Sequence, residues 1–172
     1  MTLSSSVILT PRLELVPLVA DDADEMAIVL GDERMHEFTG GSPLSVDELR
    51  ERYRFLVVGR SPDGSELWFN WIMRSRADTA AVGVVQATVA ADGTSASVAW
   101  EVGTPWQRKG YASEAASAMV EWLVHEGVTI IEAHIHARHR ASCRVAEHIG
   151  LKPTAGTIGG ETVWRCPTDT EV

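Results

Sequence analysis

The chain has 172 residues, a formal net charge of -9 and a hydrophobic share of 45%. The length fits one domain with a substantial core, and the hydrophobic share excludes a disordered chain. The acidic balance argues against general binding of nucleic acid, and Cys143 and Cys166 form neither a disulfide framework nor a Cys-x-x-Cys pair.

Residues 1–10 contain no secretory signal. The longest weakly polar run, residues 80–91, falls short of the ~20 residues that a membrane helix needs. We therefore expect a single domain over residues 1–172 that is cytoplasmic and associates with neither a membrane nor nucleic acid.

The N-terminal third predicts one strand and two helices. Alternating apolar residues over 12–18 indicate a short strand. Asp21 or Asp22 is placed to cap a helix that ends near Gly31, and residues 33–43 follow as a loop. Ser45 and Glu48 have the spacing of a capping box, which predicts the start of a second helix.

The middle of the chain predicts three consecutive antiparallel strands over residues 67–73, 81–90 and 95–103. Asp92-Gly93 is a hairpin signal between the second and third. Trp68 and Trp71 are three residues apart and so face opposite sides of their strand.

Residues 98–127 carry the clearest chemical signal. A strand ends at Thr104-Pro105, and apolar residues three or four apart predict a helix from Tyr111 to Gly127. The first turn of a helix offers unpaired N–H groups to an anion, and Gly110 lets a ligand approach the backbone. Arg108 and Lys109 add positive charge that suits a phosphate. The alternative is an ordinary strand–turn–helix junction with two solvated cations.

The C-terminal part predicts a strand over 129–136 and a helix over 141–148 that ends at Gly150. A hairpin formed by strands from Leu151 and over 162–165 closes the chain.

Two segments resemble a known family. Val102, Gln107, Gly110 and Ala112 have the spacing V-x-x-x-x-[QR]-x-x-G-x-[GA], which resembles the acyl-CoA pyrophosphate loop of the GNAT acetyltransferase superfamily. Residues 100–116 and the opening 10–23 look most like its RimJ/RimL-type branch, which acetylates protein N-termini and other amines.

The second segment, residues 139–151, resembles the branch pattern N-x-x-S-x-R-V-x-E-x-x-G-F. The matching positions are Ser142, Arg144, Val145, Glu147 and Gly150. His139 replaces the asparagine, which questions the side-chain contact that asparagine makes in relatives, and Leu151 replaces the phenylalanine.

The resemblance implies the α+β, three-layer GNAT fold. We expect a mixed, mostly antiparallel sheet of about six or seven strands with about four helices, and acyl-CoA at its splayed centre. It also implies acetyl-CoA as co-substrate, a primary amine (a protein N-terminus or a small amine) as acceptor, and a monomer or homodimer.

Site residues follow from the same resemblance. The residues expected to contact acetyl-CoA are Trp100, Val102, Gln107, Arg108, Lys109, Gly110, Tyr111, Ala112, Ser113, His139 and Ser142. Those expected on the acceptor side are His36, Glu37, Phe38, Trp68 and His136.

Acetyl transfer from a thioester to an amine requires amine deprotonation, carbonyl polarisation and protonation of the leaving thiolate. By resemblance, a backbone N–H at or beside Val102 polarises the carbonyl and Ser142 protonates the thiolate; a helix-capping role is the alternative for Ser142. Glu101 is the candidate base, with His134, His136 or an ordered water as alternatives, and an ion pair as its structural alternative.

Two other functions stay open. His134, His136 and His139 provide three imidazoles for a zinc site, which would indicate a metal hydrolase. The missing asparagine also permits a non-catalytic acyl-CoA sensor of the same fold.

The first 60 residues are rich in carboxylates, which would favour a basic acceptor by steering cations to the site. These acidic residues are Asp21, Asp22, Asp24, Glu25, Asp32, Glu33 and Glu37.

Overall fold

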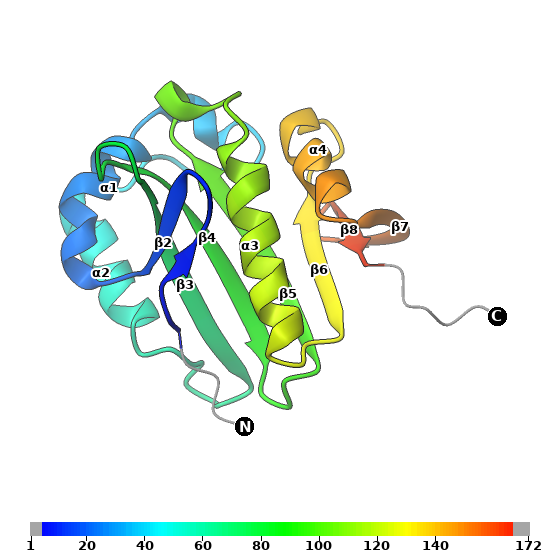
Figure 1. Ribbon diagram of the computed structural model, residues 1–172. Helices are drawn as coiled ribbons and strands as arrows, with labels where there is room; N and C mark the ends of the chain where they lie inside the picture. The colour runs from blue at the N-terminus through cyan, green and yellow to red at the C-terminus, as the bar shows by residue number, and fades with distance from the viewer. Residues whose placement is uncertain (1–4, 167–172) are drawn as a thin grey trace.

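The computed structural model describes residues 5–166, which form one eight-stranded sheet with four α-helices (Figure 1). The strand order is β1-β2-β3-β4-β5-β6-β8-β7, and every neighbouring pair is antiparallel except β5 and β6. The expected α+β fold with a mixed, mostly antiparallel sheet is confirmed. The strand beyond the expected six or seven is β1 (Ile8–Leu9), which is too short to show an alternating pattern.

The remaining strands are β2 (Leu13–Pro17), β3 (Glu66–Ser75), β4 (Ala81–Ala90), β5 (Ser95–Val102), β6 (Ile130–Ile135), β7 (Lys152–Ile158) and β8 (Glu161–Arg165). The helices are α1 (Ala23–Val29), α2 (Val46–Leu56), α3 (Tyr111–His125) and α4 (Arg140–His148). Short 3-10 turns are η1 (Ala20–Asp22), η2 (Glu33–His36), which lies within the predicted loop, and η3 (Thr104–Trp106). None of the helices within residues 5–166 combines the length and the apolar character needed to cross a bilayer.

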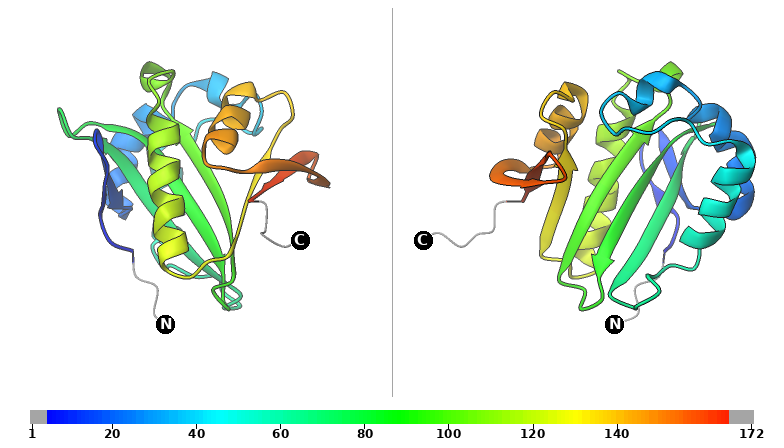
Figure 2. Two further views of the ribbon diagram at one scale, coloured as in Figure 1. Left: turned by 45° about the vertical axis from the view of Figure 1, so that its right-hand side comes forward. Right: turned by 180° about the vertical axis from the view of Figure 1, so that it is seen from behind.

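Helices cover both faces of the sheet, which gives three layers. Helix α3 packs on one face, while α1 and α2 cover the other (Figure 2). On the α3 face, Met119 and Leu123 are fully buried against a core that includes Trp71. On the other face, Met26 and Leu49 pack against Ile72 in a second core.

The two predicted helix starts have different outcomes. The capping box of α2 is confirmed, because Glu48 N–H donates to Ser45 Oγ at 3.3 Å and Ser45 N–H donates to the Glu48 carboxylate at 2.8 Å. Asp22 occupies the N-cap position of α1, but its carboxylate makes no cap hydrogen bond to the helix. It accepts instead from Val19 N–H at 2.9 Å and from Arg74 at 2.9 Å, so the predicted N-cap position is confirmed although the carboxylate caps no N–H of α1.

The sheet splays between β5 and β6. Their parallel pairing joins only Ser95–Ser97 to Ile130–Glu132, after which β6 pairs with β8 instead. The far end of β5 therefore has a strand partner only on its β4 side. Gly103 N–H donates to Val82 O at 2.9 Å, and the alternation of an antiparallel ladder then turns the N–H and C=O groups of Trp100 and Val102 towards the gap.

Candidate active site

The loop that follows β5 is held in place by its own side chains and by a strained backbone. Gln107 Nε2 donates to Val102 O at 2.9 Å and so ties the loop to the end of β5. Arg108 has φ 61° and Gly110 has φ 81°, both in the left-handed region. The left-handed backbone at these two residues changes the direction of the chain immediately before α3, whose N-cap is Gly110.

The loop and the first turn of α3 present a row of unpaired donors. Glu114 N–H is the first to make a helical bond, to Gly110 O at 3.0 Å. Within residues 5–166, the backbone N–H groups of residues 108–113 donate to no protein acceptor. Together with the positive end of the helix dipole and the cations Arg108 and Lys109, they suit a phosphate or pyrophosphate.

Arg12, which immediately precedes β2, holds this loop in place through its side chain. Its guanidinium donates to Lys109 O at 2.8 Å and to the Glu114 carboxylate at 2.7 Å, and it lies over the Tyr111 ring at 4.8 Å. Thr10 Oγ1 donates to the same carboxylate at 2.6 Å. Burial raises the pKa of Glu114, but the bonds from Thr10 and Arg12 outweigh it and hold the pKa below its usual value. The negative charge of Glu114 is thereby balanced by the guanidinium of Arg12.

Gly110 is required by its surroundings as well as by its backbone conformation. A Cβ built there would lie 3.3 Å from the Arg12 guanidinium. Gly127, at the other end of α3, also has a positive φ of 95°, but a Cβ there would meet nothing within 4 Å. The two glycines therefore share a backbone conformation that would strain any substituted residue, and they differ in what surrounds them.

Across the gap, α4 begins with His139 at its N-cap position. The His139 ring stacks on Phe38 with centroids 4.7 Å apart, and the His136 ring lies 5.5 Å from Phe38. Burial, with a smaller contribution from His136, lowers the pKa of His139. Ser142 is half-buried in the first turn of α4, and its hydroxyl bonds to none of the described residues.

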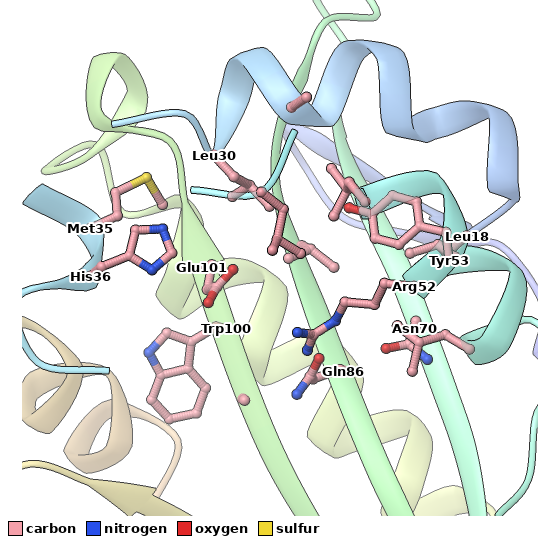
Figure 3. Close-up of a pocket in the computed structure, with 16 residues that line it drawn as sticks. Leu18, Leu30, Met35, His36, Arg52, Tyr53, Asn70, Gln86, Trp100 and Glu101 are labelled. Atoms are coloured by element: carbon pink, nitrogen blue, oxygen red, sulfur yellow. The ribbon is translucent and has the colours of Figure 1, made fainter. Parts of the chain in front are cut away.

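A cavity of about 180 Å³ lies on the α1–α2 face of the sheet, beside the far end of β5 (Figure 3). Its floor comes from β3, β4 and β5, and its walls come from α1, α2 and the segment between them. The walls are mainly aliphatic, and polar groups project from the floor and from α2. The lining residues are Leu18, Ala27, Leu30, Met35, His36, Leu44, Leu49, Arg52, Tyr53, Leu56, Asn70, Val84, Gln86, Ala99, Trp100 and Glu101.

The structure brings some predicted site residues to this cavity and places others elsewhere. Glu101, Trp100 and His36 line it, whereas Phe38 and His136 lie together beside α4. Trp68 packs on Phe55 with centroids 5.0 Å apart, outside the lining. Glu37 is exposed and also lies outside it.

Four polar lining residues were not predicted: Arg52, Tyr53, Asn70 and Gln86. Asn70 and Gln86 interrupt otherwise apolar strands, a signal that the sequence contained. The Tyr53 hydroxyl is buried with no hydrogen-bond partner among the described residues. Burial first, and then Glu101 and Asp22, raises the pKa of Tyr53, so this phenol is protonated at neutral pH.

Four of the seven carboxylates expected to attract a basic acceptor are paired with arginines. Asp22 and Glu25 pair with Arg74 at 2.9 and 2.8 Å. Asp24 pairs with Arg50 at 2.7 Å, and Asp32 pairs with Arg34 at 2.6 Å. None of the seven acidic residues lines the cavity, where, among the described residues, Glu101 is the acidic side chain and His36 and Arg52 are the basic ones.

The three histidines do not gather into a metal site. Within residues 5–166, no group of three His, Cys, Asp or Glu side chains is placed to hold a metal ion. His136 Nδ1 accepts from Arg138 N–H at 3.2 Å, and His134 Nε2 lies 3.8 Å from Glu132. The metal-hydrolase hypothesis is left without a set of ligands.

Comparison with known proteins agrees with this geometry. The family model described as an acetyltransferase (GNAT) domain matches residues 12–152. No curated protein matches the sequence significantly.

Solved structures share the fold at low identity. The ribosomal-protein α-N-acetyltransferase RimL, in complex with coenzyme A, has a TM-score of 0.80 at 14% identity, over 96% of this chain and 100% of that one. A putative ribosomal-protein-serine acetyltransferase from Vibrio cholerae has a TM-score of 0.73 at 20% identity, over 94% and 97%. An aminoglycoside acetyltransferase in complex with coenzyme A has a TM-score of 0.71 at 18% identity, over 95% of both chains.

Proposed function

The chain belongs to the GNAT acetyltransferase family, and on that premise we propose that it transfers an acetyl group from acetyl-CoA to a primary amine by direct attack in a ternary complex. The observation that carries the proposal is the row of unpaired N–H groups over residues 108–113, at the end of the open edge of β5. The acceptor is a protein N-terminus or a small amine.

The residues around the gap fit acetyl-CoA. The N–H groups of residues 108–113, with Arg108 and Lys109, would hold the pyrophosphate. The free edge of β5 at Trp100 and Val102 offers donors and acceptors to the amide groups of the pantetheine arm. His139 and Ser142, at the start of α4, border the gap from the β6 side.

The reaction forms a C–N bond and breaks a C–S bond. The amine nitrogen attacks the thioester carbonyl carbon, whose oxygen Val102 N–H or its neighbour polarises. Glu101 takes the proton that the amine loses, either directly or through a water. Ser142 gives a proton to the departing thiolate. The place of Glu101 in the cavity lining supports it over His136, which lies outside the lining.

Within the family we propose the RimJ/RimL-type branch. The segments 100–116 and 139–151 support it, as does the likeness of the fold to RimL over nearly the full length of both chains. The sensor hypothesis shares every binding feature and differs in turnover alone.

Thiol release tests the proposal. Purified protein is mixed with acetyl-CoA and a panel of small amines and N-terminal peptides, and free CoA is measured with a thiol reagent. We expect amine-dependent release, together with a CoA-dependent rise in melting temperature. A rise in melting temperature without release for any amine supports the sensor, and the absence of both effects contradicts the proposal.

A further inference from the structure

The cavity beside β5 contains a cation that the fold does not use. Arg52 on α2 lines the cavity while remaining exposed to solvent, and its guanidinium neither bonds nor pairs with any of the described residues. Arg50 on the same helix pairs with both Asp24 and Asp47, whereas Arg54 is also unpaired among the described residues but lies outside the cavity lining. An arginine fork matches a carboxylate with two parallel hydrogen bonds.

Two amide side chains complete a set of donors around Arg52. Asn70 on β3 and Gln86 on β4 are direct register partners, so they lie side by side on the cavity floor. The guanidinium of Arg52 points towards Gln86 (Figure 3). Neither amide side chain bonds to another described residue. Three donors that the protein leaves free therefore face one part of the cavity.

The acid of the cavity lies in a different part. Glu101 pairs in register with Val84, two residues along β4 from Gln86. Such diagonal neighbours are separated by about 7–8 Å. Glu101 and Arg52 form no ion pair with each other, and in Figure 3 the Glu101 carboxylate lies towards His36. The cavity thus carries Glu101, beside His36, in one part and the unpaired Arg52 in another.

Aliphatic side chains line the rest of the cavity, among them Leu30, Leu49 and Leu56. The volume of about 180 Å³ lies below the range of drug-sized ligand sites, which begins at about 300 Å³. The occupant is therefore small, with an apolar part and two opposite charges.

We propose that the acceptor is a small zwitterionic amine, an amino acid with an aliphatic side chain. Its amine lies at Glu101, its carboxylate binds Arg52 with the amides of Asn70 and Gln86, and its side chain packs on the leucines. The inference rests on the proposed function and replaces the purely basic acceptor expected from the acid content of the sequence.

Matched acceptors test the role of the carboxylate. Thiol release is measured with leucine, leucinamide and 3-methylbutylamine, which share a side chain and an amine but differ in the carboxylate. We expect the highest kcat/KM for leucine. In Arg52→Gln, KM for leucine should rise about tenfold, while the KM values for the two acceptors without a carboxylate stay unchanged. Arg52→Lys should be intermediate, because an ammonium lacks the fork.

Arg54→Gln is the control, since Arg54 is exposed on the same helix and lies outside the cavity lining. It should behave as the wild type with every acceptor. A second readout without turnover is the rise in melting temperature caused by leucine in the presence of CoA, which Arg52→Gln should remove.

The outcomes separate the two claims. If 3-methylbutylamine is used as well as leucine and Arg52→Gln changes neither, the zwitterion inference is overturned while amine acetylation stands. If no amine releases CoA from protein that still binds it, the proposed function fails and the inference fails with it.

Discussion

The two halves of the site are built in different ways. The loop between β5 and α3 is made of backbone: free N–H groups over residues 108–113, a left-handed Gly110 and the open edge of β5. The acceptor cavity is made of side chains from α1, α2, β3, β4 and β5, which are scattered along the sequence. A site made of backbone groups tolerates change in most of its side chains, whereas the selection of the acceptor that we propose depends on the polar side chains of the cavity.

The largest effect is expected on CoA binding, from a substitution in the loop between β5 and α3. Gly110→Val should abolish the CoA-dependent rise in melting temperature, because a side chain there meets Arg12 and blocks approach to the donors. Gly127→Val is the control, since it carries a similar left-handed strain of about 1–2 kcal/mol with open space around it. It should lose stability but keep the full CoA shift. A normal CoA shift in Gly110→Val would remove the loop from the binding site.

In the cavity half, Glu101→Gln should lower kcat by about a hundredfold, because proton transfer by a positioned base contributes at least that much. CoA binding should stay unchanged, since Glu101 lines the cavity and not the loop. The measurement is the pH–rate profile beside Glu121→Gln, an exposed acid on α3. If the rise in rate with pH is the same in both variants, water or His136 accepts the proton instead.

Ser142→Ala should lower kcat by about tenfold. This effect is smaller than that of Glu101→Gln because a thiolate is a good leaving group even without a proton donor. The Kd for CoA should not change, since a proton donor to the thiolate acts mainly in the transition state. Ser117→Ala on α3 is the control for loss of a helical hydroxyl. A lower melting temperature with unchanged turnover would make Ser142 a structural residue.

The difference between the halves also explains what could be predicted from the sequence. Strand β4 was predicted at its observed bounds, and the capping box of α2 was found, because both depend on residues close in sequence. The loop was recognised for the same reason, since Val102, Gln107 and Gly110 lie within nine residues. Family membership and the fold are confirmed, while the role of each site residue stays a prediction.

The cavity could not be predicted in the same way. Arg52 and Gln86 are separated by more than thirty residues and line the same cavity only because the fold brings α2 and β4 together around it. The sequence gives no sign that the carboxylates near the N-terminus have partners, but Arg74 on β3 forms ion pairs with both Asp22 and Glu25. Tertiary ion pairs of this kind leave no local pattern, so the sequence could not reveal that these carboxylates are paired.

The smallest effect concerns the buried hydroxyl of the cavity. Tyr53→Phe should leave the protein as stable or raise its free energy of unfolding by up to about 1 kcal/mol, because an unsatisfied buried polar group costs free energy. Tyr111→Phe is the control for stability, since that ring is half-buried and its hydroxyl forms no hydrogen bond with the described residues. Thermal unfolding is measured for both variants, and the acceptor KM for Tyr53→Phe and the wild type. If Tyr53→Phe is stable but has a raised acceptor KM, the hydroxyl contributes to acceptor binding and lowers the stability of the fold. A loss of stability would mean that it has a partner in solution, and the cavity would then be less apolar than its lining indicates.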